Sequence, residues 1–266
     1  MDKRVLVCPL RSGSSGNAVL ISDRHTNILI DAGVSCCTVE KALASLGQSA
    51  DSLTALLVTH EHSDHVLGIG VLMRRYGLPL FVNLPTWQAM QGSIGLVDPS
   101  LVHIIDRTGS FSIGSFAISS FATPHDAVAS AGFRLETDSG TVSLMTDIGE
   151  VTPSLLEQVS GSQAVLIEAN YDPAMLMAGP YPALLKQRVN SPVGHLSNEA
   201  CAHAVAALLQ QGTEHFILSH LSKDNNFPEL AMLTVGRHLN AINAQVGEDV
   251  MISVARRFAV SDPVWL

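Results

Sequence analysis

Cysteine is scarce in this sequence, and long apolar runs are missing. The four cysteines, Cys8, Cys36, Cys37 and Cys201, show no CxxC spacing, which argues against a disulfide framework. No apolar run approaches the roughly 18 residues that a membrane span needs. The start of the chain, Met1–Val7, lacks the apolar region and cleavage site of a signal peptide. We therefore expect a protein of the reducing cytoplasm with no membrane partner.

Basic residues are also few. Lysine and arginine number 15 against 24 aspartates and glutamates, which gives a formal net charge of −9 at pH 7. This balance opposes long-range attraction to nucleic acid, so any grip on a phosphate backbone must be local. Apolar residues make up 47% and charged residues 15%, so a large core is available. Length alone does not separate one large domain from two small ones. We expect a single domain over residues 1–266.

Apolar periodicity predicts a sheet core with helices on its outer faces. Short apolar runs predict strands at Val5–Val7, Ala18–Ile21, Ile28–Ile30, Ala55–Val58, Leu80–Val82, Phe116–Phe121, Val142–Met145, Ala164–Ile167, Phe216–Leu218 and Met251–Val254. Helical spacing predicts helices at Val39–Leu46, Val66–Tyr76, Ser154–Val159, Glu199–Gln210 and Pro228–Asn240. The segment 172–194 is rich in proline and glycine, and we expect it to be an irregular, substrate-facing flap.

The most informative motif is His60-Glu61-His62-Ser63-Asp64-His65, which follows the predicted strand Ala55–Val58. His60 and His62, two residues apart on an extended segment, point the same way. Asp64 and His65 come where a helix begins, with Ser63 as the predicted N-cap, so they can aim at a second point. Histidine nitrogens and a carboxylate without cysteine suit Zn²⁺ or Mn²⁺. The pattern predicts two adjacent metal ions; the alternative is a solvated, charged helix start.

Three further strand ends carry residues that can bind metal. His125, Asp147 and His220 each lie just beyond the carboxyl end of a predicted strand, where sheets of this kind build their sites. Asp147 is the best candidate to bridge two ions because a carboxylate has two oxygens. Taken singly, His125 would more often be a loop residue, and Asp147 before glycine would more often be a turn residue.

Glu168 and His195 form a second candidate pair. Glu168 closes the strand Ala164–Ile167, where an acidic side chain is costly unless it is paired. His195 precedes a predicted helix, and a carboxylate that orients an imidazole is a common acid–base device. The alternative is that one residue merely ends a strand and the other merely precedes a helix cap.

The loop Ser12–Asn17 alternates glycines with hydroxyl side chains, and such loops can expose backbone N–H groups to an anion. Ser14 and Asn17 are therefore candidates to bind substrate phosphate, although the same composition also makes an ordinary hairpin turn. Asp31, after the predicted strand Ile28–Ile30, is expected to order the nearby ligand loop.

Together these residues resemble a known family. The HEHSDH motif with His125, Asp147 and His220 is similar to the ligand set of the metallo-β-lactamase fold, a four-layer αββα sandwich of the α+β class. Glu168 and the Gly-His-Leu-Ser motif around His195 resemble motifs of ribonuclease Z. The match is closer to its small YycJ branch, also called WalJ or VicX. The features of this branch are the Ser12–Asn17 loop, Tyr181-Pro182 with Lys186 and Arg188, and the ending Leu221–Asn226.

The resemblance implies a metal-dependent nuclease, with 5′-to-3′ exonuclease action on DNA. One ion would be held by His60, His62 and His125, the other by Asp64, His65 and His220, with Asp147 shared; His195, oriented by Glu168, would protonate the leaving oxygen. Two ions roughly 3.5–4 Å apart can hold a hydroxide for in-line attack. Lys186 and Arg188 are further candidates for phosphate contacts, with DNA a better substrate than RNA.

Some family features are missing, and other functions stay open. Only a short segment separates Glu168 from His195, so the large inserted domain of ribonuclease J-like enzymes is absent. The long arm with which ribonuclease Z grips tRNA is not evident either. One rival is hydrolysis of a small substrate, namely a cyclic phosphodiester, a lactone or a thioester. The other is a regulatory binding module without catalysis. The sequence does not determine the oligomeric state.

Overall fold

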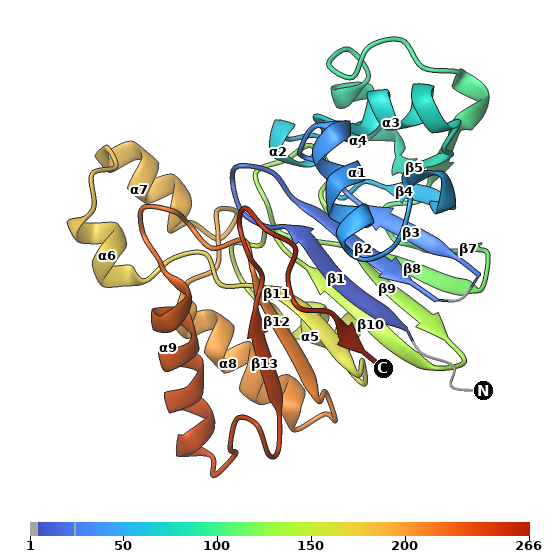
Figure 1. Ribbon diagram of the computed structural model, residues 1–266. Coiled ribbons are helices and arrows are strands. Elements are labelled where there is room, and N and C mark those ends of the chain that lie inside the picture. Colours follow the sequence, from blue (N-terminus) through green and yellow to red (C-terminus); the bar gives the residue numbers. More distant parts are fainter. Residues whose placement is uncertain (1–4, 24) are drawn as a thin grey trace. The chain divides into compact units, whose positions relative to one another are not determined.

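The computed structural model describes residues 5–23 and 25–266 (Figure 1). Residues 1–4, the first part of the segment predicted to lack a signal peptide, lie outside the described residues. The chain divides into two compact units. Unit 1 comprises the described residues up to Ala122 together with Ala127–Gly140 and Arg256–Leu266, and unit 2 comprises Thr123–Asp126 and Thr141–Ala255. Within the described residues, every helix is too short or too polar to cross a bilayer.

Unit 1 holds a seven-stranded sheet of order β14-β1-β2-β3-β4-β5-β6. Its first three strands pair antiparallel, as adjacent hairpins do, and β3 to β6 run parallel. Three more strands, β7 to β9, form an antiparallel ribbon in the same unit. The strands are β1 (Leu6–Arg11), β2 (Ala18–Ser22), β3 (Asn27–Ile30), β4 (Ala55–Leu57), β5 (Leu80–Asn83), β6 (Val102–Ile105), β7 (Gly109–Ile113), β8 (Phe116–Ala122), β9 (Ala131–Thr137) and β14 (Val264–Trp265).

Helices of unit 1 bury their apolar side chains against this sheet. Val39 and Leu43 on α1 and Leu72 on α3 join Leu20 and Leu56 of the strands in one buried core. Figure 1 shows α1 and α3 beside β1 to β5. Removing such side chains from water is the main source of stability for a fold of this kind. The helices are α1 (Cys36–Ser45), α2 (Ser63–Val66), α3 (Ile69–Tyr76) and α4 (Leu84–Met90), with short 3₁₀ turns at Ala50–Ser52 and Pro99–Leu101.

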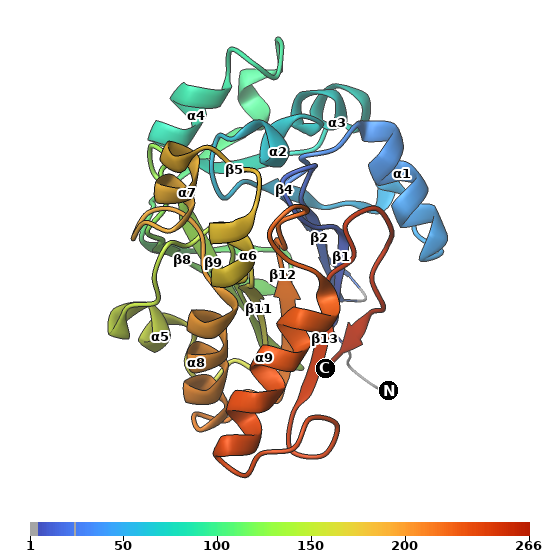
Figure 2. The same cartoon turned by 90° about the vertical axis from the view of Figure 1, so that its left-hand side faces the viewer.

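Unit 2 is a parallel ribbon covered by helices. β10 pairs with β11, β11 with β12 and β12 with β13, all parallel. Parallel neighbours need crossover connections, and the three connections contain α5, α8 and α9. The helices α8 and α9 lie side by side along the strands (Figure 2). The elements are β10 (Gly140–Met145), α5 (Pro153–Val159), β11 (Ala164–Glu168), α6 (Pro173–Ala178), α7 (Ala183–Val189), α8 (Asn198–Leu209), β12 (His215–Ser219), α9 (Pro228–Ala241) and β13 (Met251–Val254).

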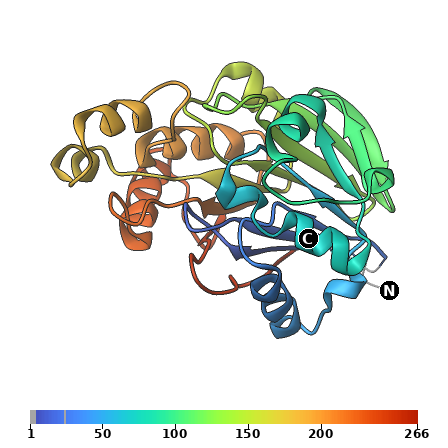
Figure 3. The same ribbon diagram turned by 90° about the horizontal axis from the view of Figure 1, so that it is seen from above.

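The expected irregular segment 172–194 contains two short helices instead. Asp172 caps α6 by accepting a hydrogen bond from Met175 N, and Pro173 occupies the first helical position, a favourable N-terminal pair. Tyr171, Leu176 and Val189 form a small buried cluster that holds α6 and α7 together. Figure 3 shows the two helices projecting away from the strands of unit 2. The many prolines and glycines therefore delimit helices in this segment.

All ten predicted strands and all five predicted helices match described elements, with shifted ends. One prediction at the ligand motif is wrong: the N-cap of α2 is His62, and Ser63 is the first helical residue. Four strands, β6, β7, β9 and β14, were not predicted. Two of them, β7 and β9, do alternate apolar and polar residues, so a local signal was present in the sequence. The other two lack it, because β6 shows no regular alternation and β14 has two residues.

Candidate metal centre

Backbone strain marks three strand ends. Four described residues other than glycine have positive φ, and three of them are Asp31 (60°), Asp147 (54°) and His220 (53°). They follow β3, β10 and β12 in turn. Left-handed φ is uncommon for such residues, and it persists where surrounding contacts hold it in place. The strain turns each side chain out of the strand direction at the strand end.

In unit 1, the histidines of the HEHSDH motif crowd together after β4. His60 Nε2 lies 3.1 Å from His62 Nδ1, and the rings of His60 and His65 lie 4.0 Å apart between centroids. Asp64 Oδ2 is 3.8 Å from His65 Nε2. His60 and His65 are buried, so their ring nitrogens have little access to bulk water. Zn–N bonds are roughly 2.0–2.1 Å long, so two ring nitrogens at the His60–His62 spacing can reach one ion.

Asp31 anchors this motif from β3. Its carboxylate accepts hydrogen bonds from Thr59 N (2.9 Å) and Thr59 Oγ1 (2.8 Å) and lies 2.8 Å from His65 Nδ1. A carboxylate only accepts, so the proton of His65 sits on Nδ1 and the lone pair sits on Nε2. A carboxylate that fixes the tautomer in this way is a usual support for a metal-binding histidine.

Asn17 ties the Ser12–Asn17 loop to the same motif. Its Nδ2 lies 3.0 Å from His65 Nε2 and 3.4 Å from Asp64 Oδ2, and its Oδ1 accepts from Gly13 N. Ser14, at the loop tip, is exposed. Gly16 has φ +134°, and a Cβ there would meet Gly33 O at 2.5 Å, so the loop needs glycine at this position. Binding of substrate by Ser14 and Asn17 stays a prediction.

In unit 2, one carboxylate serves two histidines. Glu168 Oε1 lies 2.7 Å from His195 Nδ1 and 2.9 Å from His220 Nδ1, and Oε2 accepts from Ile148 N (2.8 Å) and Leu196 N (3.3 Å). Glu168 is fully buried, whereas the His195 side chain is 23% exposed. The two imidazoles carry their protons on Nδ1 and direct Nε2 away from Glu168.

The same contacts explain the shifted pKa values. Burial alone would raise the pKa of Glu168, but His195, followed by His220, outweighs it and holds the pKa far below its usual range. Burial alone would lower the pKa of His195, yet the Glu168 carboxylate prevails and raises it. The arrangement favours an ionised Glu168 and a protonated His195, which suits a proton donor.

Asp147 and His125 complete the cluster of unit 2. Asp147 Oδ1 lies 3.2 Å from His220 Nδ1 and 3.9 Å from His125 Nε2. His125 Nδ1 lies 3.0 Å from the carbonyl oxygen of Gly194, one residue before His195. Burial lowers the pKa of His125, which favours the neutral imidazole that metals bind.

Lys186 and Arg188, the basic residues of the predicted flap, already have partners within unit 2. Lys186 Nζ donates to Met177 O at 2.6 Å, so this hydrogen bond links α7 to α6. Arg188 forms an ion pair with Asp126, which raises the pKa of Arg188. Asp126 is the neighbour of His125, so α7 is coupled to the His125 loop. The predicted phosphate contacts would have to compete with these internal partners.

Asn170 supports the site but is not among the predicted site residues. Asn170 is buried; its Nδ2 donates to His220 O at 2.8 Å, and its backbone N donates to Leu196 O. It therefore links the loop after β11 to those that carry His195 and His220. The signal was present, because Asn170 stands two residues after Glu168, the spacing that puts side chains on one face of an extended chain.

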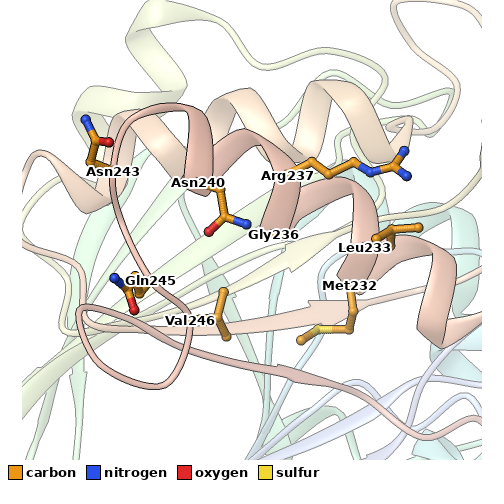
Figure 4. Close-up of a pocket in the computed structure, with 8 residues that line it drawn as sticks. All are labelled: Met232, Leu233, Gly236, Arg237, Asn240, Asn243, Gln245 and Val246. Atoms are coloured by element: carbon orange, nitrogen blue, oxygen red, sulfur yellow. The ribbon is translucent and has the colours of Figure 1, made fainter.

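A described pocket lies away from the predicted site residues. It has a volume of about 560 Å³ and is lined by the end of α9 and the following loop, through Met232, Leu233, Gly236, Arg237, Asn240, Asn243, Gln245 and Val246 (Figure 4). None of these eight residues belongs to the predicted site.

The donor chemistry of unit 2 fits a divalent ion. Asp147, Glu168, His195 and His220 each offer a ligand atom, and these atoms lie within 4.8 Å of one another. Glu168 already holds two imidazoles and two backbone N–H groups, so it acts as their support. The nitrogen and oxygen donors, with no thiolate, match the preferences of Zn²⁺ and Mn²⁺.

Two mixed sheets with flanking helices and a histidine–aspartate metal cluster define a protein of the metallo-β-lactamase fold. The family model for the β-lactamase superfamily domain matches residues 26–221. The crystal structure of the metallo-β-lactamase fold protein YhfI from Bacillus subtilis superposes with a TM-score of 0.72 at 17% identity, over 98% of this chain and 99% of that one. The predicted αββα fold class is thus confirmed.

Sequence relatives narrow the family further. The exodeoxyribonuclease WalJ of Streptococcus pneumoniae serotype 2 (strain D39) is 41% identical over 245 residues, which is 91% of each chain. The exodeoxyribonuclease YycJ of Bacillus anthracis is 36% identical over 239 residues, or 90% of each. The chain belongs to the β-lactamase superfamily and, within it, to the family of WalJ and YycJ.

Proposed function

We propose that this protein is a metal-dependent exodeoxyribonuclease that degrades DNA in the 5′-to-3′ direction. The observation that carries the proposal is the Glu168–His195 pair beside Asp147 and His220, a proton donor next to metal-binding side chains. The identity to two exodeoxyribonucleases over about nine-tenths of the chain supports DNA as the substrate.

We propose Zn²⁺ or Mn²⁺ as the ions, two per chain. His60, His62 and His125 would hold one, Asp64, His65 and His220 the other, and Asp147 would contact both. When bound, such ions neutralise the charge of a phosphodiester and lower the pKa of an attacking water. Asp31 holds His65 in the tautomer that leaves Nε2 for an ion, and Glu168 does the same for His220.

His195 is the proposed acid. Glu168 accepts the Nδ1 proton and stabilises the imidazolium, so Nε2 can give its proton to the leaving 3′ oxygen of the DNA strand. His195 is the partly exposed member of the pair, whereas Glu168 is buried, so the imidazole can meet substrate and the carboxylate cannot.

The test is hydrolysis of end-labelled nucleic acids. Purified protein with Mn²⁺ or Zn²⁺ should shorten 5′-labelled DNA by releasing labelled mononucleotides first, and a chelator should stop the reaction. Asp64→Ala should be inactive yet folded, because Asp64 lies in the first turn of α2 with a partly exposed side chain and not in the core. Internal cuts would make the protein an endonuclease. Faster cleavage of RNA, or hydrolysis of lactones, thioesters or cyclic phosphodiesters without DNA cleavage, would overturn the proposal.

A further inference from the structure

The loop between β13 and β14 presents an exposed aromatic ring. Phe258 is 70% exposed, against 53% for Trp265 and 45% for Phe227, the other exposed aromatic side chains among the described residues. A single exposed apolar side chain is ordinary on a protein surface. Phe258 stands out because of how the chain holds it.

Both ends of the loop are fastened to buried Ser261. Arg256 N donates to Ser261 Oγ (2.9 Å), and Ser261 N donates to Pro9 O (3.0 Å). The Cys8 thiol donates to Ser261 O at 3.4 Å. These bonds close a short loop whose tip is Arg257-Phe258-Ala259. The ends of the loop backbone are therefore restrained before any ligand arrives, which lowers the entropic cost of ordering the loop on binding.

One positively charged side chain lies near the ring. The guanidinium carbon of Arg257 lies 5.9 Å from the centroid of Phe258, within reach of a cation–π contact. Arg256 Nη2 lies 2.7 Å from Asp262 Oδ2, and Asp262 is 83% exposed. An exposed ion pair of this kind is weak, so Arg256 can exchange Asp262 for another anion.

Covalent geometry limits how far Phe258 can lie from Ala255, the last residue of unit 2. Ala255 N donates to Leu218 O, two residues before His220. Phe258 is three residues further along, and a chain extends at most about 3.6 Å per residue, so its Cα lies within roughly 11 Å of that of Ala255. The limit follows from covalent geometry alone.

We propose that Phe258, backed by Arg257, is a stacking platform for nucleobases of single-stranded DNA. The inference rests on the proposed nuclease function and extends it to a binding residue. Bases offer their faces only where the strand is unpaired, and stacking on an aromatic ring tolerates any sequence. Stacking also needs little positive charge, which suits a protein with a net charge of −9.

The test uses the full-length protein and a 5′-labelled oligothymidylate of about 16 nucleotides, near the upper size of a single-strand site. Phe258→Ala and Phe258→Leu should both raise the KM for the oligonucleotide by roughly 5- to 150-fold. The Kd, measured with the same changes made in the inactive Asp64→Ala variant, should rise by a similar factor. Phe258→Trp should restore binding and show quenched fluorescence when the oligonucleotide is added. Trp265→Ala, which removes another exposed aromatic ring of the same terminal segment, should leave both constants unchanged.

Hydrolysis of bis(p-nitrophenyl) phosphate separates binding from catalysis. All Phe258 variants should hydrolyse it at the wild-type rate. If Phe258→Leu binds the oligonucleotide as tightly as the wild type, the stacking proposal is wrong. It is also wrong if the Phe258 variants lose activity equally on DNA and on bis(p-nitrophenyl) phosphate, because the loop would then support the catalytic centre. If the wild-type protein binds oligothymidylate through Phe258 but does not cleave it, the proposed nuclease function fails while the platform stands. Tighter binding of oligouridylate would reassign the platform to RNA.

Discussion

The two units present their predicted metal ligands in different ways. Unit 1 carries four ligands within six consecutive residues, His60–His65, supported from one side by Asp31. Unit 2 carries its ligands on separate loops, and Glu168 connects them by holding His195 and His220 with one oxygen and two backbone N–H groups with the other. A contiguous motif is ordered mainly by its own turn, whereas dispersed ligands depend on a shared partner. We therefore expect unit 2 to be more sensitive to loss of its carboxylate.

The largest effect should follow Glu168→Ala. The change leaves two imidazoles and two backbone N–H groups without their acceptor, and breaking a buried charge pair costs about 3–5 kcal/mol of unfolding free energy. Urea unfolding of the metal-free protein measures this loss. Asp31→Ala is the matched variant in unit 1 and should cost less. Equal losses in the two variants would contradict the difference proposed between the units.

His195→Ala should lower kcat by roughly 10²–10⁴, the usual contribution of a general acid, with metal content unchanged. The reason is that His195 is held by Glu168 at Nδ1 and is the more exposed member of the pair. Single-turnover cleavage of DNA together with elemental analysis tests this. If metal is lost along with activity, His195 is a ligand, and the division between support and ligand in unit 2 is wrong.

Asp31→Asn should weaken metal binding by roughly 10- to 100-fold, as loss of a supporting carboxylate usually does. The neutral amide of asparagine is a weaker acceptor than the carboxylate for the hydrogen bonds from Thr59 and His65. His65 therefore loses its fixed tautomer. Competition with a chelator gives the affinity. Thr59→Val, which removes only the hydroxyl, is the control and should fall between the variant and the wild type. An unchanged affinity would show that the contiguous motif orders itself.

The smallest effect should come from Lys186→Ala combined with Arg188→Ala. Both side chains already have partners in Met177 O and Asp126, so their contribution to DNA binding is limited to a few-fold change in KM. Each phosphate contact adds a slope of about −0.9 to the salt dependence on duplex DNA, so the dependence should be shallow. Rates on bis(p-nitrophenyl) phosphate should not change. If they fall, the Arg188–Asp126 pair serves the His125 loop and not the substrate.

Local patterns in the chain were enough to predict the types of the site residues and most of the strands that carry them. The HEHSDH motif predicts a metal site because its donor side chains are close together in the sequence. Strands such as Ala164–Glu168 are predicted by a short run of apolar residues. The sequence also predicts that Glu168 orients His195, because an acidic side chain at a buried strand end requires a partner.

Contacts between distant segments of the folded chain determine how those residues are held. Glu168 and His220 are 52 positions apart, so no local pattern shows that one carboxylate supports two histidines. The contact of Asn17 with His65 and that of Asn170 with His220 are likewise long-range, and the helices α6 and α7 form where proline and glycine suggested irregular chain. Periodicity records which face of an element is buried, whereas hydrogen-bond partners and left-handed strand ends depend on segments that meet only after folding.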